Sequence, residues 1–129
     1  MATAQELMQI GQQLKEACEA GTDKQFREQM YCQECVSAEA APMLGQASNE
    51  AVGLEAIQAK NEWWTNANEL HEFQIQGPFI HGNNQISFFY EIDVTNKESG
   101  ERSLMQEVAN YYVNKDGKIE REEFAYAMG

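Results

Sequence analysis

The sequence predicts an α+β protein, with three helices in the first half of the chain and an antiparallel sheet in the second half. Apolar residues recur every three or four positions up to about residue 66, which is typical of amphipathic helices. Beyond His71 they alternate with polar residues, which is typical of strands with two different faces. At 129 residues the chain is long enough to bury one core, so residues 1–129 are expected to form a single domain.

Capping residues and apolar spacing define the first two helices. Thr3 and Glu6 have the spacing of a capping box, so the first helix is expected to begin after Thr3 and to end near Gly21. Thr22 or Asp23 can cap a second, shorter helix. The residues expected to face the core from these helices are Leu7, Ile10, Leu14, Ala17, Phe26 and Met30.

A third helix is predicted over residues 52–66, after an irregular stretch that contains proline and glycine. Leu54, Ile57 and Trp64 lie close to one face of this helix. Trp63 and Trp64 stand near its end, so the chain is expected to leave the helix there.

Two strands follow, joined by a turn at residues 81–84. The first alternates from Phe73 to Phe79, and its Gly-Pro pair indicates an edge strand or a bulge. The second is predicted over residues 85–94, with Glu91 on its less apolar face. The residues expected on its apolar face are Phe88, Tyr90, Ile92 and Val94.

The last quarter of the chain has two interpretations. Residues 114–118 separate two amphipathic runs, and Asp-Gly between such runs is a strong β-hairpin signal because glycine tolerates positive φ. The same segment also has most of the side chains of a twelve-residue calcium loop with Gly117 at the sixth position. Tyr112 would then occupy the first ligand position, and the flanking runs favour strands. The hairpin is therefore preferred to the calcium loop.

Both faces of the sheet are expected to carry apolar residues, in a hairpin register that pairs Val113 with Ile119. One face is predicted to hold Met105, Glu107, Ala109, Tyr111, Val113, Ile119, Arg121 and Glu123. The other is predicted to hold Leu104, Val108, Tyr112, Phe124 and Tyr126. A solvated face should be polar, so we expect the helices to cover one face and a second subunit to cover much of the other, in a homodimer.

Charge and hydropathy disfavour several kinds of partner. The chain has 21 acidic residues against 9 Lys and Arg, and its formal net charge of −12 disfavours nucleic acid and anionic membrane surfaces. Its apolar runs are shorter than a bilayer requires, and residues 1–10 lack the pattern of a secretory signal. Three cysteines, an odd number, fit a reducing compartment. We therefore expect a cytoplasmic protein.

Cys32 and Cys35 have the spacing of a redox or zinc motif. A zinc site would have to recruit Cys18 with His71 or His81 from distant segments. A redox site would follow a strand and open a helix, whereas this pair follows the predicted second helix. Two partly buried thiols at a helix end are preferred, and neither a metal nor a cofactor is expected.

The order of these elements, together with several short matches, resembles the SnoaL-like branch of the nuclear-transport-factor-two-like superfamily. The matches are Gly21 with Phe26 and Tyr31 in the second helix, Gly53-Leu54-Glu55-Ala56-Ile57 leading to Trp63-Trp64, and Asp116-Gly117-Lys118-Ile119 in the final turn. The resemblance implies a cone-shaped, cystatin-like α+β barrel around a pocket for an apolar small molecule, commonly dimeric through the sheet. Relatives include polyketide cyclases, ketosteroid isomerases, dehydratases and epoxide hydrolases, so the fold does not choose a reaction.

The cyclase-like members of that branch place an Asp before the final turn and a His after it. The residues near those points here are Glu107, Ala109 and Asn110 before the turn, and Arg121, Glu122 and Glu123 after it. The resemblance therefore transfers no catalytic residue by position.

Glu107 is the first candidate for catalysis. Desolvation in an apolar cavity raises the pKa of a carboxylate and lets it move a proton next to a carbonyl group. Tyr111 shares the predicted face of Glu107 and could donate a hydrogen bond to a developing oxyanion. The alternative is a glutamate that is solvated or paired with Arg121.

Seven further residues are candidates for a ligand site: Tyr31, Trp63 and Trp64 as aromatic walls, His71 near the mouth, and Glu39, Glu91 and Glu123 as further carboxylates. Ordinary core packing or surface exposure is the alternative for each. The leading interpretation is a pocket protein for an apolar, carbonyl-bearing metabolite, with any activity being cofactor-free proton transfer of the cyclase or isomerase type. The competing interpretation is a non-catalytic ligand-binding or structural dimer, so whether the chain is an enzyme stays open.

Overall fold

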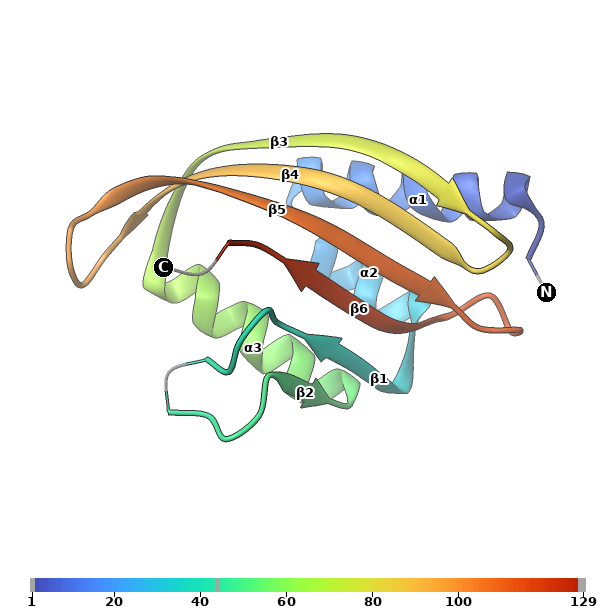
Figure 1. The fold of residues 1–129 in the computed structure, drawn as a ribbon, viewed down its shortest axis with the longest axis horizontal. Coiled ribbons are helices and arrows are strands. Elements are labelled where there is room, and N and C mark those ends of the chain that lie inside the picture. The colour runs from blue at the N-terminus through green and yellow to red at the C-terminus, as the bar shows by residue number, and fades with distance from the viewer. Residues whose placement is uncertain (1, 44, 128–129) are drawn as a thin grey trace.

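Three helices pack against one curved, six-stranded sheet in the computed structural model of this chain (Figure 1). The structure describes residues 2–43 and 45–127. The elements in chain order are α1 (Ala4–Ala20), α2 (Asp23–Met30), β1 (Tyr31–Ala38), β2 (Glu50–Val52), α3 (Leu54–Ala67), β3 (Asn68–His81), β4 (Gln85–Asn96), β5 (Arg102–Val113) and β6 (Ile119–Ala125). The predicted α+β class, with three helices on a curved sheet, is confirmed.

The strand order is β2-β1-β6-β5-β4-β3, so β2 and β3 form two edges and the sheet stays open. This corrects the predicted barrel. The sheet is also mixed, because β1 runs parallel to β6 while the other neighbouring pairs are antiparallel. Buried residues of the helices and of the sheet form one core. We call the sheet face toward this core the inner face and the opposite one the outer face.

β1 is the main difference from the sequence prediction, which places Tyr31 in the second helix and Cys32 and Cys35 at its end. All three residues lie on this strand. Cys35 and Ser37 are fully buried, and a register shift precedes Val36. Such a bulge interrupts the two-residue alternation by which a strand is recognised in a sequence. The cysteines of the chain are free thiols.

α1 forms as its capping residues predict. The Thr3 side chain accepts from the Glu6 backbone N–H, and the Glu6 carboxylate accepts from that of Thr3, which completes the capping box. A side chain at Gly11 would place its Cβ 2.6 Å from the Pro78 Cβ. The close approach of α1 to β3 therefore requires glycine at this position.

The long strands β3, β4 and β5 form an antiparallel meander that carries much of the core. The predicted apolar face of β4 is confirmed, since its four residues are all buried: Phe88, Tyr90, Ile92 and Val94. The strands in Figure 1 arch over α3, so their inner face is directed toward the helices.

The final turn is a β-hairpin turn, as predicted, and not a calcium loop. β5 and β6 flank it as strands, with Gly117 at φ 77° and the Asn114 side chain accepting from the backbone N–H groups of Asp116 and Lys118. Among the residues that the structure describes, no group of three or more His, Cys, Asp or Glu is arranged to hold a metal ion. Asn114, which resembled a calcium ligand in the sequence, instead shapes the turn through its side chain.

A bulge at Glu120 corrects the predicted faces of β6. Val113 pairs with Ile119 as predicted, but Tyr112 pairs with Arg121, so one extra residue lies between them. A one-residue slip moves every later side chain to the other face. The residues whose predicted faces are wrong are Arg121 and Glu123, which are on the outer face, and Phe124 and Tyr126, which are on the inner side.

Two further features of the surface bear on function. No helix in residues 2–43 and 45–127 is long and apolar enough to cross a membrane. The outer face of β5 exposes two large apolar side chains, Leu104 at 61% and Val108 at 42%.

Candidate functional site

Glu107 lies on the inner face of β5 and is only partly buried. The register of β4 and β5 places it beside Tyr90, and the two-residue alternation of β5 places Met105 and Ala109 on the same face. In the described part of the chain, no hydrogen bond reaches the Glu107 carboxylate. Glu107 is thus a carboxyl group on the core side of the sheet that is free to meet a ligand.

The surroundings of Glu107 strongly disfavour its charged form. Burial raises the pKa of Glu107 from 4.5 to about 7, and the nearby carboxylates of Glu39 and Glu122 contribute to this rise. The ammonium group of Lys60 opposes this effect. Near neutral pH the group therefore holds its proton for part of the time, which is the condition for general acid–base chemistry.

Glu122 is a buried carboxylate whose two oxygens are both occupied. The residue is 3% exposed on the inner face of β6. One of its oxygens accepts a hydrogen bond from the Tyr31 hydroxyl, and the other accepts from Ser37 Oγ at 2.5 Å. Because both of its oxygens accept hydrogen bonds, the Glu122 side chain is held in place in the core.

Lys60 connects this carboxylate to Glu39. Its Nζ donates to Ser37 Oγ at 2.5 Å and to Glu39 Oε2 at 2.9 Å, and it lies 5.4 Å from the centre of the Phe124 ring. The remaining Glu39 oxygen accepts from the Tyr126 hydroxyl at 3.0 Å. We call the connected residues Tyr31, Glu122, Ser37, Lys60, Glu39 and Tyr126 the inner network.

Tyr111 is buried in the core, and its hydroxyl pairs with Tyr90 and not with Glu107. Its hydroxyl lies 2.8 Å from that of Tyr90, and burial raises its pKa well above the usual value. Glu107 and Tyr111 are four positions apart on β5, so their backbones are separated by about 13 Å along the strand. The Tyr111 hydroxyl therefore contacts Tyr90, the residue that pairs with Glu107 across β4 and β5.

The structure brings some of the predicted site residues together and separates others. Tyr31 and Glu39 belong to the inner network, and Trp64 is partly buried against the core. The other predicted residues lie elsewhere. Trp63 is 53% exposed, and His71 is at an exposed position, where its Nε2 lies 2.7 Å from Thr95 Oγ1. Glu91 and Glu123 are on the outer face, where Glu123 accepts hydrogen bonds from Arg121 and Tyr112.

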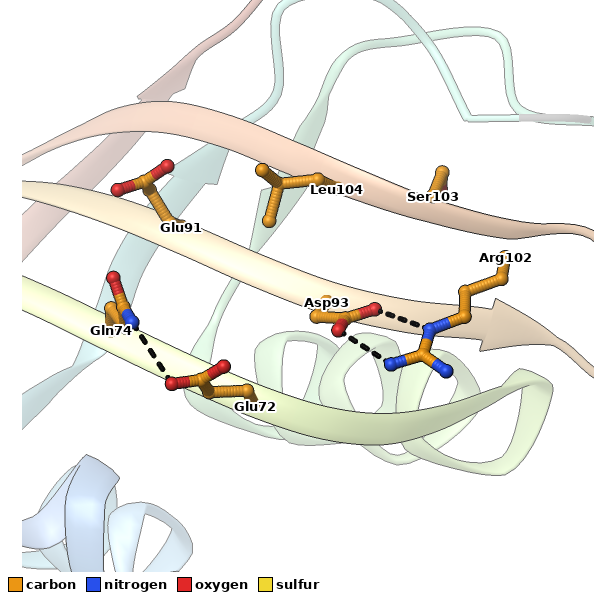
Figure 2. Close-up of a pocket in the computed structure, with 7 residues that line it drawn as sticks. All are labelled: Glu72, Gln74, Glu91, Asp93, Arg102, Ser103 and Leu104. Carbon is orange, nitrogen blue, oxygen red and sulfur yellow. Dashed lines mark hydrogen bonds and ion pairs between the residues drawn. The ribbon is translucent and has the colours of Figure 1, made fainter.

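Figure 2 shows a pocket on the outer face, with a volume of about 440 Å³. Glu91 lines it, and Arg102 pairs with Asp93 through two hydrogen bonds of 3.0 and 2.9 Å. A second pocket of about 390 Å³ opens near Tyr112, also on this face. Glu107 does not line either pocket. The site around Glu107 is therefore described by the side chains and the charges that surround this residue.

Sequence reasoning misses Ser37, Lys60 and Glu122. The signal for Lys60 exists, because it follows Ile57 by three positions and precedes Trp64 by four, on the inward face of α3. Glu122 could be placed only once the bulge in β6 is known. Ser37 lies on a strand that its sequence does not reveal.

Comparison with known proteins supports the same fold. Among curated proteins, none matches this sequence. A Mesorhizobium loti protein, provisionally described as a SnoaL-like polyketide cyclase, is 33% identical over 92% of this chain and 97% of its own, with a TM-score of 0.81. The Mycobacterium tuberculosis protein RV0760c, solved in complex with estradiol-17beta-hemisuccinate, is 18% identical over 95% of each chain, with a TM-score of 0.74.

The Delta 5-3-ketosteroid isomerase of a Mycobacterium species has the same fold, with a TM-score of 0.72 and 15% identity over 95% of this chain and 94% of its own. The family model of the SnoaL-like domain matches residues 3–126, which is nearly the whole chain. The chain therefore belongs to the SnoaL-like family.

Proposed function

We propose that the inner face around Glu107 binds an apolar small molecule that bears a carbonyl group, and that Glu107 exchanges a proton with it. One observation carries this proposal: Glu107 is a partly buried carboxyl group, free of hydrogen bonds within the described residues, with a pKa of about 7. Met105 is on the same face of β5 as Glu107, and Phe73 packs against Tyr90, which pairs with Glu107. Both are partly buried, so apolar surface is available to a ligand beside Glu107.

The proton transfer follows from the charges around Glu107. The ionised carboxylate takes a proton from the carbon next to the carbonyl. The electron pair of that C–H bond forms a C=C bond, and the π pair of the carbonyl group moves onto its oxygen to give an enolate. The protonated carboxyl then returns a proton to a carbon of the same ligand, so the reaction needs no cofactor. Lys60 supplies positive charge within electrostatic reach of Glu107, which offsets part of the negative charge that an enolate would meet from Glu39 and Glu122.

A bound ligand can be recognised by its mass, whatever its chemical identity. Native mass spectrometry of the purified protein is expected to show a bound small molecule, and solvent deuterium is expected to enter that molecule at the carbon next to its carbonyl. Glu107→Gln should keep the bound mass and abolish the deuterium incorporation. Glu91→Gln, which changes a carboxylate on the outer face of the neighbouring strand, is the matched control and should retain both. Incorporation that survives Glu107→Gln would contradict the role of Glu107.

The alternative is a dimer that binds ligand without catalysis or has a structural role. Exposed Leu104 and Val108 on the outer face favour an assembly of two copies through the sheet. Sedimentation of the wild type is expected to give a dimer, and Val108→Glu is expected to give a monomer. A wild-type monomer would refute this assembly. Free Cys18, Cys32 and Cys35 support placing the protein in the cytoplasm.

A further inference from the structure

We propose that the site around Glu107 accepts uncharged ligands whose polar end is a hydrogen-bond acceptor, and that it rejects ligands ending in a carboxylate. This inference rests on the proposed function, because it concerns the polarity of the ligand that binds beside Glu107. It is carried by the hydrogen bonds and charges of the inner network.

The polar groups of the inner network are already occupied by one another. Lys60 donates to Ser37 and Glu39, while the second oxygen of Glu39 accepts from Tyr126. Both oxygens of Glu122 are likewise filled. A ligand that displaced any of these partners would leave a buried polar group unsatisfied, which is costly. The carboxyl group of Glu107 therefore remains as the polar contact that a ligand can make.

The charges that face Glu107 are mostly negative. Glu39 at the end of β1 and Glu122 on β6 are carboxylates, and Lys60 on α3 is the cation that acts on Glu107. Tyr90 on β4 and Tyr126 after β6 add hydroxyl groups without charge. When Glu107 is ionised, the site thus holds three negative carboxylates and one positive ammonium group, and its net charge is negative.

Arg27, a buried cation on α2, is engaged elsewhere. Arg27 on α2 donates to Asp23 and to Gln58, at 2.7 and 2.6 Å, and its charge acts on Tyr31. An anionic ligand end would therefore meet net negative charge in a poorly solvated place, where like charges repel strongly. A ketone oxygen is uncharged and avoids this repulsion, and it can accept a hydrogen bond from Glu107 whenever that carboxyl group holds its proton.

Two probes that share one ring system test this charge selection. PRODAN is a dimethylaminonaphthalene with a neutral ketone, and dimethylaminonaphthoate replaces the ketone with a carboxylate. At about pH 8 we expect fluorescence titration to show that PRODAN binds the wild type roughly tenfold more tightly than the naphthoate, or more. Glu107→Gln removes one of the three negative charges, so the ratio between the two affinities should fall severalfold.

Matched variants show where the probes bind. Met105→Trp adds bulk beside Glu107 on the inner face, whereas Leu104→Trp adds the same bulk to the outer face of the same strand. Thermal melts establish that each variant is folded. PRODAN binding should be weakened by Met105→Trp and preserved by Leu104→Trp.

The possible results separate the two proposals. A naphthoate that binds as tightly as PRODAN, or an affinity ratio that Glu107→Gln leaves unchanged, overturns the charge selection while the binding site stands. Wild-type protein that binds neither probe, or probe binding that is insensitive to Met105→Trp, overturns the proposed binding site and this inference with it.

Discussion

Replacing Glu107 by glutamine should stabilise the protein at alkaline pH and have little effect at acidic pH. Glutamine has nearly the shape of a protonated glutamic acid but carries no ionisable group. The variant therefore keeps the packing of the inner face and removes the cost of ionising a carboxyl group at this position.

The size of the effect follows from the pKa of Glu107. The difference between 4.5 in the unfolded chain and about 7 in the folded one, at about 1.4 kcal/mol per pH unit, corresponds to about 3 kcal/mol. Between these two values the folded state binds more protons than the unfolded state, so the free energy of unfolding falls as the pH rises. The loss is complete above about pH 7.

Urea unfolding of both proteins at two pH values measures this effect. At about pH 5 the variant should differ from the wild type by less than about 1 kcal/mol, and at about pH 8 it should be more stable by about 3 kcal/mol. Glu72→Gln, at an exposed position of β3, serves as a control and should change stability by less than about 0.5 kcal/mol at either pH. A Glu107→Gln effect that is the same at both pH values would refute the reasoning.

Two further substitutions test the inner network. Lys60→Met leaves the Glu39 carboxylate without its cation, and urea unfolding should show a loss of about 3 kcal/mol. The pKa of Glu107 should rise above about 7 as well, because the opposing charge is gone; no change in either quantity would contradict the network. Tyr31→Phe removes one donor to buried Glu122 and should cost about 1–3 kcal/mol, whereas a cost below about 0.5 kcal/mol would show that the hydrogen bond is not needed.

Local signals in the sequence predict much of the fold. The capping box at Thr3 and the Asp-Gly turn at Gly117 each depend on interactions within a few residues of the chain. A short stretch of sequence is therefore sufficient to identify them. The inner face of β5, including Glu107, follows from a two-residue alternation that no bulge interrupts between Arg102 and Tyr112.

The rest of the site depends on contacts between distant parts of the chain. The bulge at Glu120 and the register shift in β1 are set by strand pairing in three dimensions, and the bulge reverses the face of the β6 residues beyond it. Glu122 and Ser37 thus become neighbours through a parallel pairing of β1 with β6. Lys60 on α3 donates a hydrogen bond to Ser37, and no local sequence pattern predicts this contact between distant segments.

The titration of the Glu107 side chain tests the central claim most directly. Carbon-detected NMR of protein labelled at the glutamate carboxyl carbons can follow this group, with Glu107→Gln providing its assignment. A midpoint of about pH 7 is the predicted result. A midpoint near 4.5, the value of an ordinary exposed glutamate, would show that Glu107 is solvated and would contradict its role as the acid–base group of an inner site.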